Sequence, residues 1–150
     1  MAFLSGLLSI GGLLLLAGYL FRIPYLQQLQ TDARIAAAVM FILIGVMHLV
    51  KPYKLTYMIE GILPYTYALV MISGVLEILL GIGLCFPATR VYAGWGLILL
   101  LVLMFPANIH VAVKQLPAPG GLPAAPWYTW SRLAFQPVYI LWVWWAAVTA

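Results

Sequence analysis

The side chains that could do chemistry in this chain are few, and they lie inside long apolar segments. Glu77 lies about ten residues into a segment that begins near Tyr67, which places it about 15 Å deep in a membrane-spanning helix. Gly74, Glu77 and Gly81 recur at helical spacing and share one stripe, and Ser73 lies one turn before Glu77. A carboxyl group at this depth is costly in lipid, so we expect it to face the interior of a helical bundle and to accept a proton. The structural alternative is a neutral acid that hydrogen-bonds a neighbouring helix.

Other polar residues are predicted to converge near Glu77. Apolar segments that we expect to be helices cover residues 35–50, 91–113 and 133–150. If consecutive helices alternate in direction, the polar residues at the ends of the first two of these segments meet those at the start of the third at one membrane face. Tyr139 is expected at intermediate depth, above Glu77. A polar pocket open to this face would result, with ligand-binding candidates His48, Ser73, Asn108, Arg132, Gln136 and Tyr139. The structural alternatives are a wetted helix end for the histidine, a snorkelling interfacial side chain for the arginine and a helix cap for the asparagine.

The composition identifies an integral membrane protein. Of the 150 residues, 66% are hydrophobic and only 7% are charged, with a mean hydropathy of +1.10. A soluble domain carries about 25% charged residues, and disorder requires low hydrophobicity, so both classes are excluded. Nucleic-acid binding is not expected, because the net charge of +4 comes from scattered residues. The single cysteine, Cys85, excludes an intramolecular disulfide, and no metal site is predicted.

Between the charged residues, the chain contains five apolar segments, each predicted to be a membrane-spanning helix. They are residues 1–21, 35–50, 61–89, 91–113 and 133–150. Thr31 and Asp32 are a predicted N-cap for the second helix, and the four prolines within 115–131 predict a loop. The lysine and arginine residues divide almost equally between the two predicted membrane faces, so the orientation of the chain in the membrane stays open.

From residue 34 onward the sequence resembles the DoxX family of small bacterial membrane proteins. The resemblance rests on MFILIGVMHLVKP (40–52), ILP (62–64), ISGVLEILLGIGL (72–84), FPATR (86–90), FPANIHVAV (105–113) and SRLAFQPVYILWVWW (131–145). It implies an all-α, four-helix membrane bundle over 34–150 in the bacterial inner (plasma) membrane, with one extra N-terminal helix over 1–21. The family's motif positions correspond here to Gly45, His48, Ser73, Gly74, Glu77, Pro106, Ala107, Asn108, Arg132 and Gln136.

Two functions follow from the residues and the resemblance. The first is a membrane subunit associated with quinone-linked redox chemistry, because the DoxX family is named for a subunit linked to a thiosulfate:quinone oxidoreductase. Glu77 would accept a proton, His48 and Arg132 would hold a carbonyl oxygen of a quinone or isoprenoid-tailed ligand, and Asn108 and Gln136 would orient it. The second is a non-catalytic scaffold or chaperone that assembles partner proteins in the membrane.

A haem cofactor is not expected, although two histidines lie near the same membrane face. His110 follows Asn108 by two residues, which turns it about 200° around the helix and away from the predicted pocket. The identity of the ligand, the presence of catalysis, a redox partner protein and the oligomeric state stay open at this point.

Overall fold

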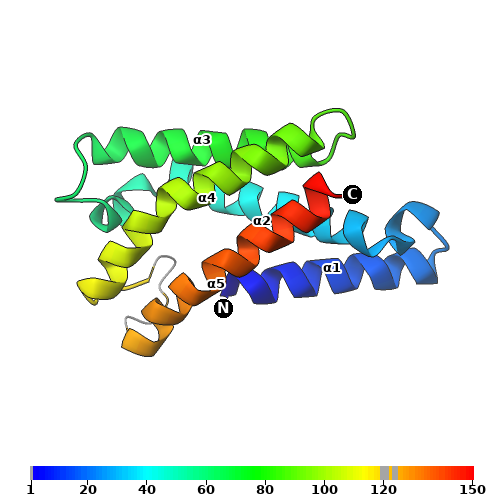
Figure 1. Ribbon diagram of the computed structural model, residues 1–150, viewed down its shortest axis with the longest axis horizontal. Helices are drawn as coiled ribbons and strands as arrows, with labels where there is room; N and C mark the ends of the chain where they lie inside the picture. The colour runs from blue at the N-terminus through cyan, green and yellow to red at the C-terminus, as the bar shows by residue number, and fades with distance from the viewer. Residues whose placement is uncertain (1, 119–121, 123–124) are drawn as a thin grey trace.

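The computed structural model describes residues 2–118, 122 and 125–150, and it is all-α over these residues. Five long helices follow one another along the chain (Figure 1): α1 (Ala2–Leu20), α2 (Leu29–Val50), α3 (Thr66–Leu84), α4 (Arg90–Val113) and α5 (Pro126–Val143). Short 3-10 turns over Pro24–Gln27, Pro52–Lys54 and Thr56–Met58 join the first three helices, and a π-helical turn over Trp144–Val148 extends α5. The predicted all-α class is therefore confirmed for the described part of the chain.

Four of the five predicted spans correspond to helices that are long and apolar enough to cross a membrane. These are α1, α2, α3 and α4, and α5 is not among them. The first turns of α5 carry Thr129, Ser131, Arg132 and Gln136, which lowers its apolar character. The fifth span therefore stays a prediction.

Two predicted helix boundaries were wrong. Helix α2 begins at Leu29, so Thr31 and Asp32 lie within its first turns, and no side chain caps its N-terminus. Helix α5 begins at Pro126 and not after the proline-rich segment, because the first helical position needs no backbone N–H donor and suits the fixed φ of proline.

Helix α2 lies at the centre of the molecule. Its consecutive residues Ala36, Ala37 and Ala38 are almost completely buried. They form the core together with Leu7 of α1, Leu84 of α3, Leu97 of α4 and Val143 of α5. Small side chains let other elements approach this helix closely, so α2 can contact α1, α3 and the C-terminal turn at once.

Glycines set the close approach of α2 and α3. A Cβ atom added at Gly45 would lie 2.6 Å from the carbonyl oxygen of Gly74, and one added at Gly81 would lie 2.9 Å from Ile42 Cγ1. Gly74 itself would carry its Cβ 2.6 Å from the Cβ of His48. The two glycines predicted to share a stripe with Glu77 therefore do face the neighbouring helix, and no larger residue fits there without moving it.

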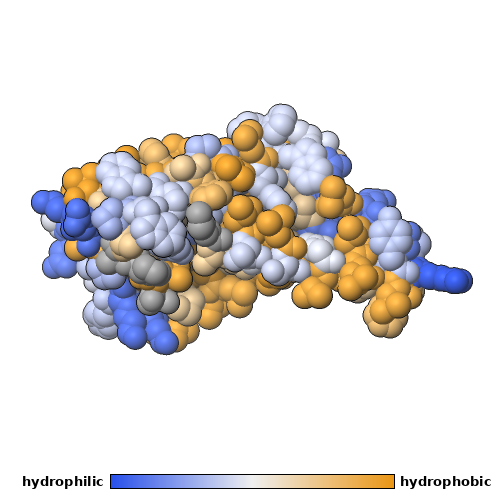
Figure 2. Space-filling model, turned by 90° about the horizontal axis from the view of Figure 1, so that it is seen from below, coloured by the Kyte–Doolittle hydropathy of each residue, from blue (hydrophilic) through white to orange (hydrophobic). Residues whose placement is uncertain are grey.

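The surface has the distribution expected of a bundle in lipid. Figure 2 shows apolar residues over much of the middle of the molecule and hydrophilic residues mainly toward the two ends of its long axis. Large apolar side chains are exposed along the helices, among them Leu13, Leu16, Leu79, Leu99 and Leu103. A water-facing surface of this kind would be unfavourable, whereas lipid tails solvate it.

Candidate functional site

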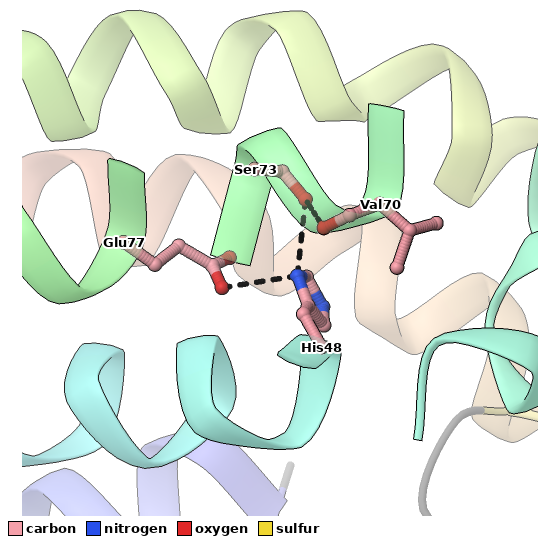
Figure 3. A network of polar contacts seen from close by, with 4 residues as sticks. All are labelled: His48, Val70, Ser73 and Glu77. Atoms are coloured by element: carbon pink, nitrogen blue, oxygen red, sulfur yellow. Dashed lines mark hydrogen bonds and ion pairs between the residues drawn. The ribbon is translucent and has the colours of Figure 1, made fainter. Parts of the chain in front are cut away.

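A buried polar cluster joins α2 to α3 at their close crossing. His48 near the end of α2 faces Ser73 and Glu77 of α3 (Figure 3). The imidazole Nδ1 lies 3.0 Å from Ser73 Oγ and 3.1 Å from Glu77 Oε2. Glu77 is 2% exposed and His48 is 9% exposed. The spacing of Ser73 and Glu77, one helical turn apart, brings both to the same ring nitrogen.

The hydrogen atoms of this cluster can be assigned in part. The hydroxyl of Ser73 donates to the carbonyl of Val70 over 2.9 Å, so its oxygen is free to accept the N–H of His48 Nδ1. Glu77 Oε2 has no aligned donor and contacts Nδ1 at ion-pair distance. A small rotation of the imidazole would therefore redirect this N–H from Ser73 Oγ to Glu77 Oε2. The imidazole of His48 and the carboxyl group of Glu77 are the two groups that can each hold this proton.

The second ring nitrogen of His48 has a different environment. In Figure 3 it points away from both Ser73 and Glu77. In the described part of the chain, some polar atoms are both buried and without a hydrogen-bond partner, and this nitrogen does not belong to them. The side chain of His48 is 11% exposed. The imidazole thus has one nitrogen against the buried carboxyl group of Glu77, and its side chain is slightly exposed. An imidazole can take up a proton at one nitrogen and release another from the second.

A separate network joins α4 to α5. Asn108 donates to Gln136 Oε1 over 2.9 Å, and Arg132 Nη2 donates to Asn108 Oδ1 over 3.2 Å. Gln136 in turn donates to the backbone carbonyl of Leu101. Gln136 is 3% exposed. The spacing of Arg132 and Gln136, four residues apart, lets both side chains reach the same asparagine across the helix interface.

The surroundings of Arg132 are aromatic. The titratable groups that act electrostatically on it are the phenols of Tyr57, Tyr128 and Tyr139. Tyr57 lies in the 3-10 turn after α2 and donates to the carbonyl of Pro117. Burial raises the pKa of the Tyr57 phenol, and the positive charge of Arg132 partly opposes this effect.

The structure does not join the two networks into the single pocket that we predicted. Among the described residues, no hydrogen bond or ion pair links the cluster on α2 and α3 to the network on α4 and α5. The reason is the pairing of the helices, because the polar residue of α2 faces α3 and the polar residue of α4 faces α5. The described part of the chain has two cavities, of about 150 and 230 Å³, which are lined mostly by apolar side chains. Of the predicted site residues, Gln136 is the one that lines either of these two cavities.

Two other aromatic or imidazole side chains lie outside both networks. Tyr139, predicted to bind ligand, packs its ring against Phe3 of α1 at a centroid distance of 4.7 Å. His110 points away from Asn108, as predicted, and its Nδ1 lies 2.9 Å from the carbonyl of Met58. It therefore links α4 to the turn after α2.

Sequence reasoning missed two buried ionisable residues near the start of α2. Asp32 is 1% exposed and Arg34 is 6% exposed. Among the described residues, neither oxygen of the Asp32 carboxyl group has a hydrogen-bond partner, and Arg34 Nε also lacks one. No signal in the sequence distinguished them, because they fall in its most polar stretch, which resembles an exposed loop. Within the described residues, no three His, Cys, Asp or Glu side chains are grouped as metal ligands.

No curated protein and no solved structure matches this chain. A family model described as a domain of unknown function, DUF8561, matches residues 37–147. The match runs from α2 through α5 and includes both polar networks, while α1 lies outside it. The chain belongs to the DUF8561 family.

Proposed function

We propose that this chain is a DoxX-like integral membrane protein of the bacterial inner membrane that serves quinone-linked redox chemistry. In this proposal the four-helix core is residues 34–150, and α1 is an additional helix. The observation that carries the proposal is the contact of 3.1 Å between His48 Nδ1 and Glu77 Oε2, buried between two membrane-spanning helices. Such a pair is an intramembrane proton site, and ionisable residues in this position are typical of proton transfer.

The chemistry follows from the two nitrogens of His48. Oxidation of a quinol to a quinone releases two electrons and two protons. A quinol hydroxyl at the outward-facing Nε2 would give its proton to the imidazole, while the proton on Nδ1 passes to the carboxylate of Glu77. The two electrons go to a redox partner protein, and the second quinol proton goes to water, so Glu77 holds one proton in the oxidised state. Glu77 thus acts as the proton acceptor, and His48 both binds the quinol and transfers its proton.

The network on α4 and α5 has no part in this step. Asn108, Arg132 and Gln136 were expected to hold and orient the quinone, but their hydrogen bonds run between another pair of helices. The ligand would instead approach the exposed edge of His48 from the lipid, which suits the isoprenoid tail of a membrane quinone.

A second candidate is a scaffold or chaperone that assembles partner proteins. The observation in its favour is that both networks pair polar side chains with one another across helix interfaces. Interhelical hydrogen bonds of this kind stabilise membrane bundles without any ligand.

One pair of variants separates the two functions. In His48→Asn, the amide nitrogen of asparagine replaces Nδ1 and keeps the contact with Ser73 and Glu77, while the outward-facing nitrogen is lost. The protein is purified in mild detergent with its native lipids, and the organic extract is analysed by mass spectrometry. We expect stoichiometric quinone with wild type and with the control His110→Asn, and none with His48→Asn. Equal quinone in all three samples, or none in any, would favour the scaffold.

A further inference from the structure

We propose that Arg132, held by Asn108 and Gln136, binds the phosphate of an anionic phospholipid whose acyl chain occupies the cavity between α4 and α5. This site is separate from the His48–Glu77 pair and does not depend on the proposed function. The inference rests on the fixed position of the guanidinium group, on its missing counter-ion and on the apolar cavity next to it.

The guanidinium group is held by a chain of three hydrogen bonds. The carbonyl of Leu101 accepts from Gln136, Gln136 Oε1 accepts from Asn108, and Asn108 Oδ1 accepts from Arg132. Each amide group uses both its donor and its acceptor end, so neither amide can flip without losing a bond. A positioned guanidinium group binds an anion more strongly than a flexible one, because less side-chain freedom is lost on binding.

The charge of Arg132 has no acidic partner. The chain has three acidic residues, and the ion pair found among the described residues joins His48 to Glu77. Asp32 lies in the first turns of α2, and Glu60 is exposed in the segment between α2 and α3. The groups that act electrostatically on Arg132 are phenols and not carboxyl groups, so no acidic counter-ion is among them.

The side chain of Arg132 is partly exposed. A guanidinium group has five N–H donors, and one of its nitrogens is bonded to Asn108. None of the nitrogens of Arg132 is among the buried atoms without a partner in the described part of the chain. Trp127 and Trp130 in the same turns of α5 are 64% and 52% exposed. Exposed tryptophans of this kind lie at the headgroup level of a membrane, where lipid phosphates are present.

An apolar cavity lies one to two turns further along the same helices. Its volume is about 150 Å³, and its lining residues are Val102, Phe105, Gln136, Pro137 and Ile140. Gln136 comes four residues after Arg132, which is about 6 Å along the helix axis. Val102 and Phe105 are 52% and 36% exposed, so the cavity is bordered by the lipid-facing surface. A phosphate at Arg132 and an acyl chain in this cavity would belong to one lipid molecule.

The test is a titration of the purified full chain in detergent with phosphatidylglycerol, followed by native mass spectrometry. Removing a charge-assisted hydrogen-bond donor should weaken binding at least roughly tenfold in Arg132→Gln. The matched control is Lys114→Gln, which removes one exposed positive charge after α4 and should change binding by less than about twofold. Equal weakening in both variants would overturn the proposal, because it would indicate a general charge effect.

Two further arms separate the parts of the site. Val102→Phe fills the cavity and leaves the polar network in place, so it should also weaken binding of phosphatidylglycerol. This variant also tests the proposal if Arg132→Gln does not fold. Unchanged binding in Val102→Phe would overturn the acyl-chain assignment. Free glycerol phosphate, which has the headgroup chemistry without a chain, should bind wild type much more weakly. Equal binding of phosphatidylglycerol and phosphatidylcholine would overturn the assignment to an anionic headgroup.

Discussion

The substitution Gly45→Ala tests the close crossing that brings His48 to Glu77. The new Cβ atom would lie 2.6 Å from the carbonyl oxygen of Gly74 and 2.7 Å from Ile78 Cγ1. Ordinary Cβ contacts begin at 3.4 Å, so α2 and α3 would have to separate by about 0.8 Å. The side chain of Ile78 can rotate away, but the carbonyl oxygen belongs to the backbone of α3 and cannot. The separation would also lengthen the contact between His48 and Glu77.

The cost can be estimated against a second glycine. Overpacking of this kind costs about 1–3 kcal/mol. Alanine is favoured over glycine in a helix by about 1 kcal/mol, which would mask part of the clash. Gly12 of α1 has no atom within 4 Å of an added Cβ, so Gly12→Ala gains the same helix propensity without a clash. The two variants should therefore differ in free energy of unfolding by about 2 kcal/mol, with Gly45→Ala the less stable.

The assay is reversible unfolding in mixed detergent micelles, followed by tryptophan fluorescence and helical circular dichroism. Gly45→Ala should unfold at a lower denaturant concentration than wild type, and Gly12→Ala at an equal or higher one. Free energies within about 0.5 kcal/mol of each other would refute the reasoning, because surface substitutions away from special features vary by that much.

Three further predictions concern the other polar groups. Gln136→Leu should lower the free energy of unfolding by about 1–3 kcal/mol, measured in the same assay, because it leaves the amide nitrogen of Asn108 and the carbonyl of Leu101 without their partner; unchanged stability would contradict the observed network. Burial raises the pKa of Tyr57, so its neutral form favours the folded state, and this contribution is lost as the pH rises through the folded pKa. Thermal unfolding midpoints measured between about pH 9 and 11 should therefore fall more steeply for wild type than for Tyr57→Phe, and parallel curves would show that Tyr57 does not contribute. Asp32→Asn should raise the thermal midpoint, because it removes a buried carboxyl group whose oxygens lack hydrogen-bond partners; a lower midpoint would indicate a stabilising partner for the carboxylate.

The spacing of residues within each helix predicted which side chains share a face. Gly74, Glu77 and Gly81 are all buried in α3, as their stripe indicated. Arg132 and Gln136 both reach the Asn108 side of α4, since four residues make about one turn of a helix. These relations depend on local geometry alone, which the sequence contains.

The pairing of the helices could not be predicted in the same way. A stripe of small and polar residues indicates that a helix has a neighbour, but it does not identify that neighbour. The expected single pocket assumed that all stripes face one centre, whereas His48 pairs with α3 and Asn108 pairs with α5. The burial of Asp32 and Arg34 was missed for a related reason. Helix α2 packs against the turn at Trp144–Val148, which is far away in the sequence, and Arg34 donates to the hydroxyl of Tyr25 in the turn before α2.

We propose that Glu77 accepts a proton through His48 when a quinol is oxidised. Infrared difference spectra between the quinol-reduced and quinone-oxidised states of the purified protein test it most directly, because a protonated carboxyl group has its own C=O stretching band. We expect such a band on oxidation in wild type and in Glu60→Gln, shifted in D₂O and absent in Glu77→Gln. Identical difference spectra for wild type and Glu77→Gln would contradict it.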